Sequence, residues 1–147
     1  MSQKQPAAIY WDASAILSVL FRDSHSEEAR AQLELPGVHL VSSLGWAETC
    51  AVISRMKREG CLGEVLLKAA YETLEEGPWR RIYVLPDYGR FKDLAGAWPL
   101  RGADLWHLAA AKTLQKEIPE LKILTFDERL RAAAEGEGLG SRTSDRA

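Results

Sequence analysis

Four acidic residues of this 147-residue chain stand where an α/β protein gathers its functional groups. Asp12 and Asp127 each follow a short apolar run, while Glu48 and Asp104 lie in the early turns of predicted helices. In open parallel sheets, ligands bind beyond the carboxyl ends of the strands, where helices begin. We therefore expect the four carboxylates to lie near one edge of a sheet.

Two of these acids are predicted to face inward. At about 100° per residue, Glu48 shares a helix face with Leu44 and Val52, and Asp104 shares one with Leu108. Solvated acids normally occupy the opposite face of such a helix. A buried carboxylate is costly unless a partner compensates for its charge.

Carboxylates gathered at one place repel one another, and a bound divalent cation reverses this effect. A set of oxygen ligands suits a hard ion such as Mg²⁺ or Mn²⁺. We expect the four acids to meet within about one coordination shell, waters included, around one or two ions. Each acid alone also has a structural interpretation, as a helix cap or as an ion-pair partner.

The composition indicates one ordinary globular domain spanning residues 1–147. Hydrophobic residues make up 46% and charged residues 27%, and the formal net charge is -2. No apolar run approaches the roughly 20 residues that span a bilayer, and the short polar N-terminus has no signal-peptide core. We expect a cytoplasmic protein, not associated with a membrane, with a mobile tail over 141–147.

Apolar periodicity and turn residues predict strands that alternate with helices. Strands are expected over 8–12, 38–41, 81–85 and 121–125. Helices are expected over 13–22, 24–35, 43–59, 62–76, 87–97 and 103–116, with a last one ending near 135. Ser24-x-x-Glu27 and Thr125-x-x-Glu128 match the capping box that opens a helix, and Ser42 or Ser43 is expected to cap the long helix. Such alternation favours a parallel sheet covered on both faces.

Several other chemistries lack their sequence signatures. The chain has no P-loop, no Gly-x-Gly-x-x-Gly turn after a strand and no Gly-x-Ser-x-Gly elbow. A phosphoaspartate hydrolase would want an acid two residues after Asp12, where this chain has Ser14. Cys50 and Cys61 form no Cys-x-x-Cys pair, so a thiolate metal site is not expected.

Four segments together resemble a PIN domain, most closely the VapC-type toxins of prokaryotic toxin–antitoxin pairs. The first is the turn Asp12-Ala13-Ser14, and the second is Trp46-Ala47-Glu48. The others are Asp104-Leu105-Trp106-His107-Leu108-Ala109 and Leu124-Thr125-Phe126-Asp127. The resemblance covers nearly the whole chain, in order, and the acid quartet is complete.

The resemblance implies a three-layer α/β/α sandwich around a parallel sheet of four strands, with a fifth left open because the C-terminal end has few apolar residues. It also implies a Mg²⁺- or Mn²⁺-dependent endoribonuclease in which Asp12, Glu48, Asp104 and Asp127 hold the ions. Ser14 and Thr125 would orient carboxylates or cap helices, and His107 is expected to be a packing residue. Possible RNA contacts flank the acids: Arg22, Arg101 and Arg129.

The same resemblance implies an RNA substrate, a homodimer and a small antitoxin partner. Two alternatives stay open at this point. One is a PIN-domain nuclease that matures RNA without an antitoxin, and the other is a non-catalytic binding module that keeps the fold.

Overall fold

A four-stranded parallel sheet forms the centre of the computed structural model, which describes residues 7–140. The strand order is β3-β2-β1-β4, with every neighbouring pair parallel. All four carboxyl ends therefore lie on one edge of the sheet. The strands are β1 (Ala7–Trp11), β2 (Gly37–Ser42), β3 (Trp79–Ile82) and β4 (Lys122–Leu124).

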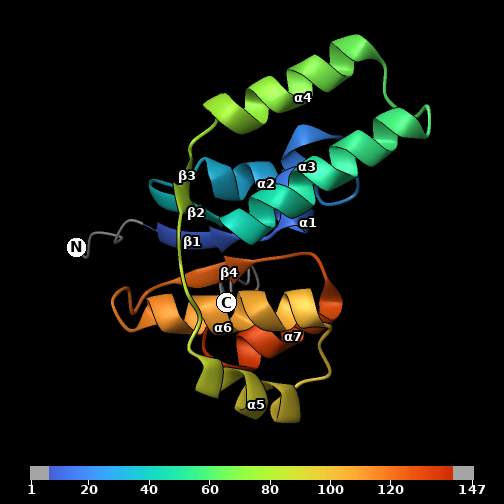
Figure 1. The fold of residues 1–147 in the computed structure, drawn as a ribbon. Helices are drawn as coiled ribbons and strands as arrows, with labels where there is room; N and C mark the ends of the chain where they lie inside the picture. Colours follow the sequence, from blue (N-terminus) through green and yellow to red (C-terminus); the bar gives the residue numbers. More distant parts are fainter. Residues whose placement is uncertain (1–6, 141–147) are drawn as a thin grey trace.

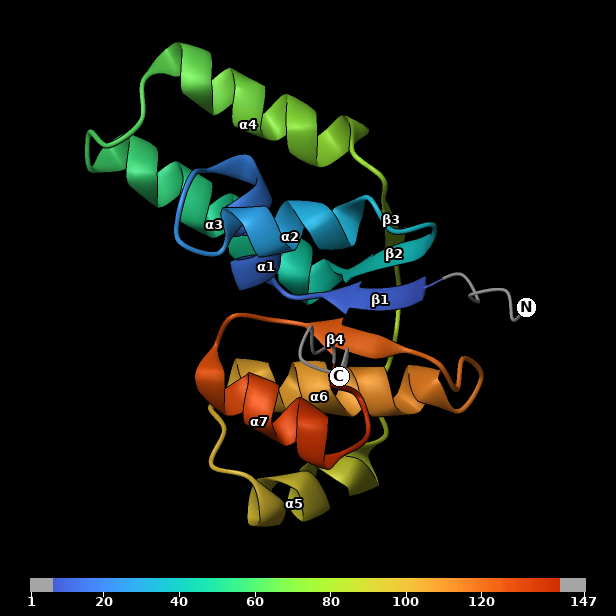
Figure 2. The ribbon, with the colours of Figure 1, turned by 180° about the vertical axis from the view of Figure 1, so that it is seen from behind.

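Helices cover both faces of this sheet, so the predicted three-layer α/β/α sandwich is confirmed (Figure 1). One layer holds α1 (Ala13–Leu20), α2 (Ser26–Leu33), α3 (Ser43–Arg58) and α4 (Glu64–Glu76). The opposite layer holds α5 (Tyr88–Ala97), α6 (Gly102–Gln115) and α7 (Glu128–Gly136). The view from behind shows the same separation, with the sheet between the two groups of helices (Figure 2).

The central strand β1 contributes side chains to the hydrophobic cores on both faces of the sheet, because side chains alternate along a strand. Ile9 and Trp11 pack into the core beneath α1 to α4, while Ala8 and Tyr10 pack into the core beneath α5 to α7. Both Tyr10 and Trp11 are fully buried. Asp12 directly follows Trp11, so the buried end of β1 fixes the position of the Asp12 backbone.

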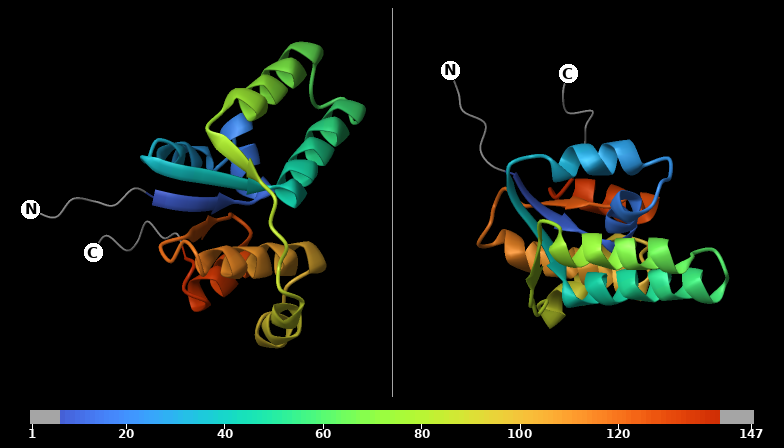
Figure 3. Two further views of the ribbon diagram at one scale, coloured as in Figure 1. Left: turned by 60° about the vertical axis from the view of Figure 1, so that its left-hand side comes forward. Right: turned by 90° about the horizontal axis from the view of Figure 1, so that it is seen from above.

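Helices α3 and α4 form a hairpin that extends beyond the sheet (Figure 3). Near the turn, Lys57 Nζ lies 3.1 Å from Glu64 Oε1, and Tyr71 Oη lies 3.1 Å from Ser54 Oγ between the helices. The base of α3 is held by Ser42, whose hydroxyl accepts a hydrogen bond from the Gly45 backbone N–H. Glu48 is carried on this anchored end of α3.

The third strand was predicted two residues too late. It runs from Trp79 to Ile82, and the predicted strand residues 83–85 lie outside the sheet. The register explains the difference, because Ile82 pairs with Ser42, the last residue of β2. Beyond that pair the neighbouring strand has ended, so the apolar residues that follow have no ladder to join.

Both predicted capping boxes are wrong. Helix α2 begins at Ser26, and its N-cap residue makes no side-chain cap. Helix α7 is capped by Asp127, whose carboxylate accepts from the Leu130 backbone N–H. Thr125 does not cap this helix: its hydroxyl donates to Asp12 and accepts from the backbone N–H of Asp127, which lies before the first helical residue.

Residues 7–140 contain no fifth strand. Gly140 forms an isolated parallel bridge with Ile123 and no longer ladder. The predicted mobile tail, 141–147, lies outside the described residues. Within 7–140, no helix combines the length and the apolar composition that crossing a bilayer requires.

We predict that Gly37→Ala strongly destabilises the protein. Gly37 opens β2 at φ +132°, and an added Cβ would lie 1.9 Å from the Ala7 carbonyl oxygen. The free energy of unfolding, measured with urea, should fall by more than about 2 kcal/mol. Gly60 is the matched control, since it has φ +75° but open space around a Cβ. Gly60→Ala should cost only about 1 kcal/mol, and equal losses for the two variants would contradict the steric argument.

Candidate functional site

Asp12 is a buried carboxylate held by three hydrogen bonds at the junction of β1 and α1. Its side chain is 4% exposed. Ser14 Oγ and the Ala15 backbone N–H donate to Oδ1 at 2.7 and 3.0 Å, and Thr125 Oγ1 donates to Oδ2 at 2.5 Å. Burial raises the pKa of Asp12, and these donors oppose the rise. Asp12 is therefore both the N-cap of α1 and a carboxylate held in a fixed orientation.

The end of β4 is tied to the same place. The Asp12 backbone N–H donates to the Leu124 carbonyl oxygen at 3.3 Å, which brings Thr125 beside Asp12. Thr125 Oγ1 also accepts from the Asp127 backbone N–H at 3.1 Å. Ser14 Oγ accepts from the Phe126 backbone N–H at 3.0 Å. The two acids that follow strands thus share one network of hydroxyl groups.

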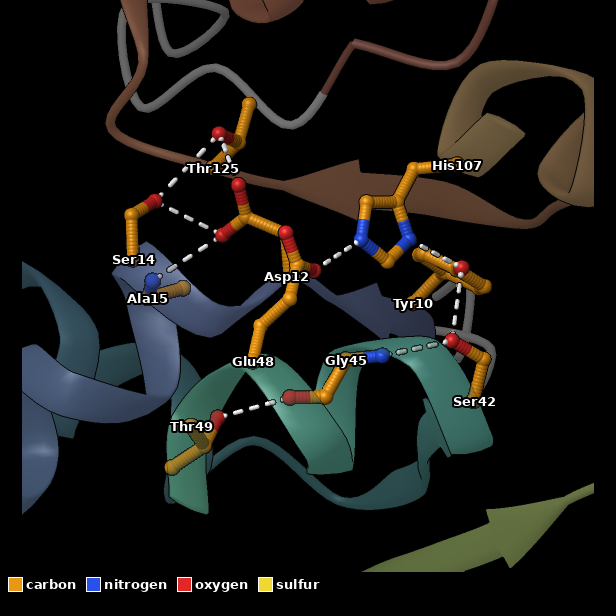
Figure 4. A network of polar contacts seen from close by, with 10 residues as sticks. All are labelled: Tyr10, Asp12, Ser14, Ala15, Ser42, Gly45, Glu48, Thr49, His107 and Thr125. Carbon is orange, nitrogen blue, oxygen red and sulfur yellow. Dashed lines mark hydrogen bonds and ion pairs between the residues drawn. The ribbon is translucent and has the colours of Figure 1, made fainter. Parts of the chain in front are cut away.

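Glu48 reaches toward this network from α3 (Figure 4). Its Oε1 lies 2.6 Å from Nε2 of His107, whose side chain is 1% exposed. The other ring nitrogen, Nδ1, lies 2.6 Å from the Tyr10 hydroxyl. Tyr10 in turn donates to Ser42 Oγ at 3.1 Å. His107 on α6, itself held by Tyr10 on β1, therefore fixes the position of the Glu48 carboxylate.

Asp104, in the first turn of α6, feels the charges of all the other acids. Burial raises its pKa first, and the charges of Asp127, Asp12 and Glu48 raise it further. The charge of His107 lowers it. Within residues 7–140, Asp104 has no hydrogen bond that would offset the repulsion. The structure thus brings the other three predicted acids within electrostatic reach of Asp104 at the carboxyl edge of the sheet.

The four side chains do not form a ready-made ligand cluster. Within residues 7–140, no three His, Cys, Asp or Glu side chains come close enough to hold a metal ion. The prediction that the acids meet in one coordination shell is therefore not met. The reason is visible in their partners, since Asp12 accepts from hydroxyls, Glu48 contacts His107 and Asp127 caps α7.

The donor set nevertheless fits a hard divalent cation by its chemistry. It consists of carboxylate oxygens alone, which Mg²⁺ and Mn²⁺ prefer. Burial and then the charges of the neighbouring acids raise the pKa of Asp104, and a bound cation would offset both effects.

Residues 9–136 match the model of the PIN domain. The chain belongs to the PIN-domain family. Ribonuclease VapC3 of Mycobacterium tuberculosis is 34% identical over 132 residues, which cover 87% of this chain and 88% of that protein. Ribonuclease VapC46 of the same organism is 32% identical over 136 residues, covering 90% and 95%. The predicted resemblance to VapC-type PIN domains is confirmed.

Solved structures show the same PIN fold at low sequence identity. M. tuberculosis VapC20, described as a sarcin-ricin loop cleaving toxin, superposes with a TM-score of 0.57 at 17% identity. The alignment covers 86% of this chain and 95% of VapC20. PAE2754 from Pyrobaculum aerophilum gives a TM-score of 0.60 at 16% identity, covering 88% and 81%. At these identities the likeness concerns the fold alone.

Two of the three predicted RNA-contacting arginines stand beside the acids of this PIN domain. Arg101 and Arg129 line a surface pocket together with Asp104, Phe126 and Asp127. Both arginines are exposed. Arg22 is exposed as well, but it is not among the residues that line this pocket. Its role stays a prediction.

Sequence reasoning missed the partners that hold Glu48. His107 was expected to be a packing residue, and Tyr10 was noted only as part of a strand. The helical phase of His107, close to that of Asp104, was the one available signal. Which acid the ring contacts depends on how α3 and α6 approach each other across the sheet edge, and a local pattern does not encode this.

We predict that Asp104→Asn stabilises the metal-free protein at neutral pH. A carboxyl group with a raised pKa binds its proton more tightly when folded, so its ionisation costs stability as the pH rises through that pKa. The amide removes the charge at equal size. Because Asp104 is only half-buried, solvent screening keeps the gain small, roughly 0.5–1 kcal/mol. Urea unfolding with chelator should show this gain at about pH 7 and lose it below the ordinary aspartate pKa of about 3.9.

Asp87 provides a control of opposite sign. Lys116 and then Arg90 hold the pKa of this exposed carboxyl below its usual range. Its ionised form therefore favours the folded state, and this contribution is present at neutral pH and lost as the pH falls through the lowered pKa. Asp87→Asn should lower stability at neutral pH. A loss of stability in Asp104→Asn at the same pH would contradict the repulsion described above.

Proposed function

We propose that this PIN-domain protein is an endoribonuclease that hydrolyses RNA phosphodiester bonds with Mg²⁺ or Mn²⁺, and that it is the toxin of a toxin–antitoxin pair. The observation that carries the proposal is that the other three acids, two of them anchored at strand ends, lie within electrostatic reach of Asp104. Relatives named as ribonucleases match across almost the whole chain.

In this proposal Asp12 and Asp104 are direct ligands, and Glu48 and Asp127 act through water or on a second ion. When bound, the cation would lower the pKa of a water molecule and stabilise the leaving oxygen. The hydroxyls of Ser14 and Thr125 keep the Asp12 carboxylate in one rotamer. Such outer contacts orient ligands and tune metal affinity.

Positive side chains at the rim suit a phosphate backbone. Arg101 and Arg129 line the pocket that Asp104 and Asp127 also line, which supports contacts to phosphates on either side of the scissile bond. Within residues 7–140 neither arginine forms an ion pair with a protein carboxylate. Their donors are therefore available to a ligand.

The proposal includes a cytoplasmic homodimer and a small antitoxin that covers the acids. The VapC names of the relatives support the antitoxin part of this proposal. Large apolar side chains exposed on α4, before α5 and at its first residue offer surface for such partners. They are Val65, Leu66, Tyr83, Leu85 and Tyr88.

We predict that Asp12→Asn abolishes RNA cleavage. Purified protein, freed of partners, should cleave structured fragments of total RNA with Mn²⁺ or Mg²⁺ and stop with chelator. Loss of a direct ligand should lower the rate by at least about 100-fold. Mn²⁺ should raise the thermal midpoint of the wild type and not that of Asp12→Asn.

Asp93→Asn serves as the matched control, since Asp93 is exposed on α5. It should cleave like the wild type. Sequencing of the RNA ends would map the cleavage site and distinguish a single target from general degradation. Cleavage by Asp12→Asn at the wild-type rate would refute the proposed mechanism.

We also predict that Arg101→Ala and Arg129→Ala each raise KM by roughly 10-fold and change kcat little, because each variant loses a charge-assisted phosphate contact. The slope of log KM against log salt should fall by about one per arginine. Arg58→Ala, at the far end of α3, is the matched control and should leave both constants unchanged. Equal effects in all three variants would indicate nonspecific charge attraction rather than contacts at the pocket.

A further inference from the structure

A buried chain of hydrogen bonds connects Glu48 to the N-terminus of the helix that carries it (Figure 4). Glu48 Oε1 contacts His107 Nε2 at 2.6 Å, and His107 Nδ1 contacts the Tyr10 hydroxyl at 2.6 Å. Tyr10 donates to Ser42 Oγ, which accepts from the Gly45 N–H at the start of α3. This series of hydrogen bonds runs from Glu48 on α3 to His107 on α6 and Tyr10 on β1. It returns to the start of α3 through Ser42.

The orientation of the His107 ring is fixed from several sides. A carboxylate only accepts hydrogen bonds, so Nε2 carries a proton where it meets Glu48. The ring stands edge-on to Tyr10, with centroids 5.6 Å apart, and edge-on to Trp106 at 5.7 Å. With 1% of its side chain exposed, His107 has little freedom to turn away.

A second buried histidine shows what a purely structural role looks like in this fold. His39 is 4% exposed. Its Nδ1 accepts from Trp11 Nε1 at 3.1 Å, and its Nε2 lies 3.1 Å from the Leu35 carbonyl oxygen. Both contacts of His39 therefore stay within the scaffold. His107 instead directs one nitrogen to a half-exposed carboxylate at the sheet edge.

We propose that His107 is a positioning residue that holds the Glu48 carboxylate toward the proposed cation site, with Tyr10 and Ser42 fixing the ring. This inference rests on the proposed function. One oxygen of Glu48 is held by His107, and within residues 7–140 the other, Oε2, has no hydrogen-bond partner. Glu48 thus presents Oε2 from a fixed rotamer, which reduces the entropy lost when it binds a ligand.

Two amide substitutions of His107 test the contacts of its two ring nitrogens separately. The side chain of His107→Gln reaches the position of Nε2 and keeps a donor for Glu48. The side chain of His107→Asn reaches only the position of Nδ1, so it keeps a partner for Tyr10 and loses Glu48. His39→Asn is the matched control for the removal of a buried imidazole elsewhere in the fold.

The first readout is Mn²⁺ binding without RNA, followed by electron paramagnetic resonance. His107→Asn should weaken Mn²⁺ binding by about 10- to 100-fold, as loss of an outer contact does in other metal sites. His107→Gln should stay within about threefold of the wild type. His39→Asn should lower the thermal midpoint and leave Mn²⁺ affinity unchanged.

The second readout needs no metal. Carbon-13 relaxation of the Glu48 carboxyl should show an ordered group in the wild type and in His107→Gln, and a mobile one in His107→Asn. A Glu48 carboxyl that stays ordered in His107→Asn, or equal loss of Mn²⁺ affinity in both amide variants, would overturn the positioning role. If Glu48 becomes mobile as expected but the wild type binds no Mn²⁺, the proposed metal-dependent function fails while the positioning contact stands.

Discussion

The buried carboxylate of Asp12 is the constraint on which the carboxyl edge of this sheet depends. A carboxyl group at 4% exposure is costly unless hydrogen bonds replace those lost to water. Ser14, Ala15 and Thr125 supply those donors from two different strand–helix junctions. The requirement therefore ties the end of β1 to the end of β4.

The same residues serve structure and the proposed chemistry without conflict. Asp12 and Asp127 are helix caps, and capping is what holds their carboxylates at the strand ends. Glu48 also has both roles, because its contact with His107 links α3 to α6. Asp104 is the exception, since within residues 7–140 no hydrogen bond compensates its charge and the neighbouring acids repel it. In the proposed function, a bound cation would offset this repulsion.

Several features of the fold could be predicted from local sequence because local physics determines them. The apolar run ending at Asp12, the break at Gly60 and the alanine-rich stretch of α6 follow from periodicity and turn chemistry. The end of β3 could not, because Ile82 is the last residue with a partner and that partner is Ser42 of a neighbouring strand. The hydrogen bond from Thr125 to Asp12 likewise joins residues that are far apart in the chain.

The sequence by itself determined the α/β class, the four acids and the inward helical phases of Glu48 and Asp104, since these depend on spacings of a few residues. Tertiary structure alone decided that Asp104 would feel three other acids and that Glu48 would meet His107. It also decided that Arg101 and Arg129, but not Arg22, would line the pocket beside Asp104. The physical reason is the same in each case: the contacts join residues that are distant along the chain, and their distances are set by how the helices pack on the two faces of the sheet.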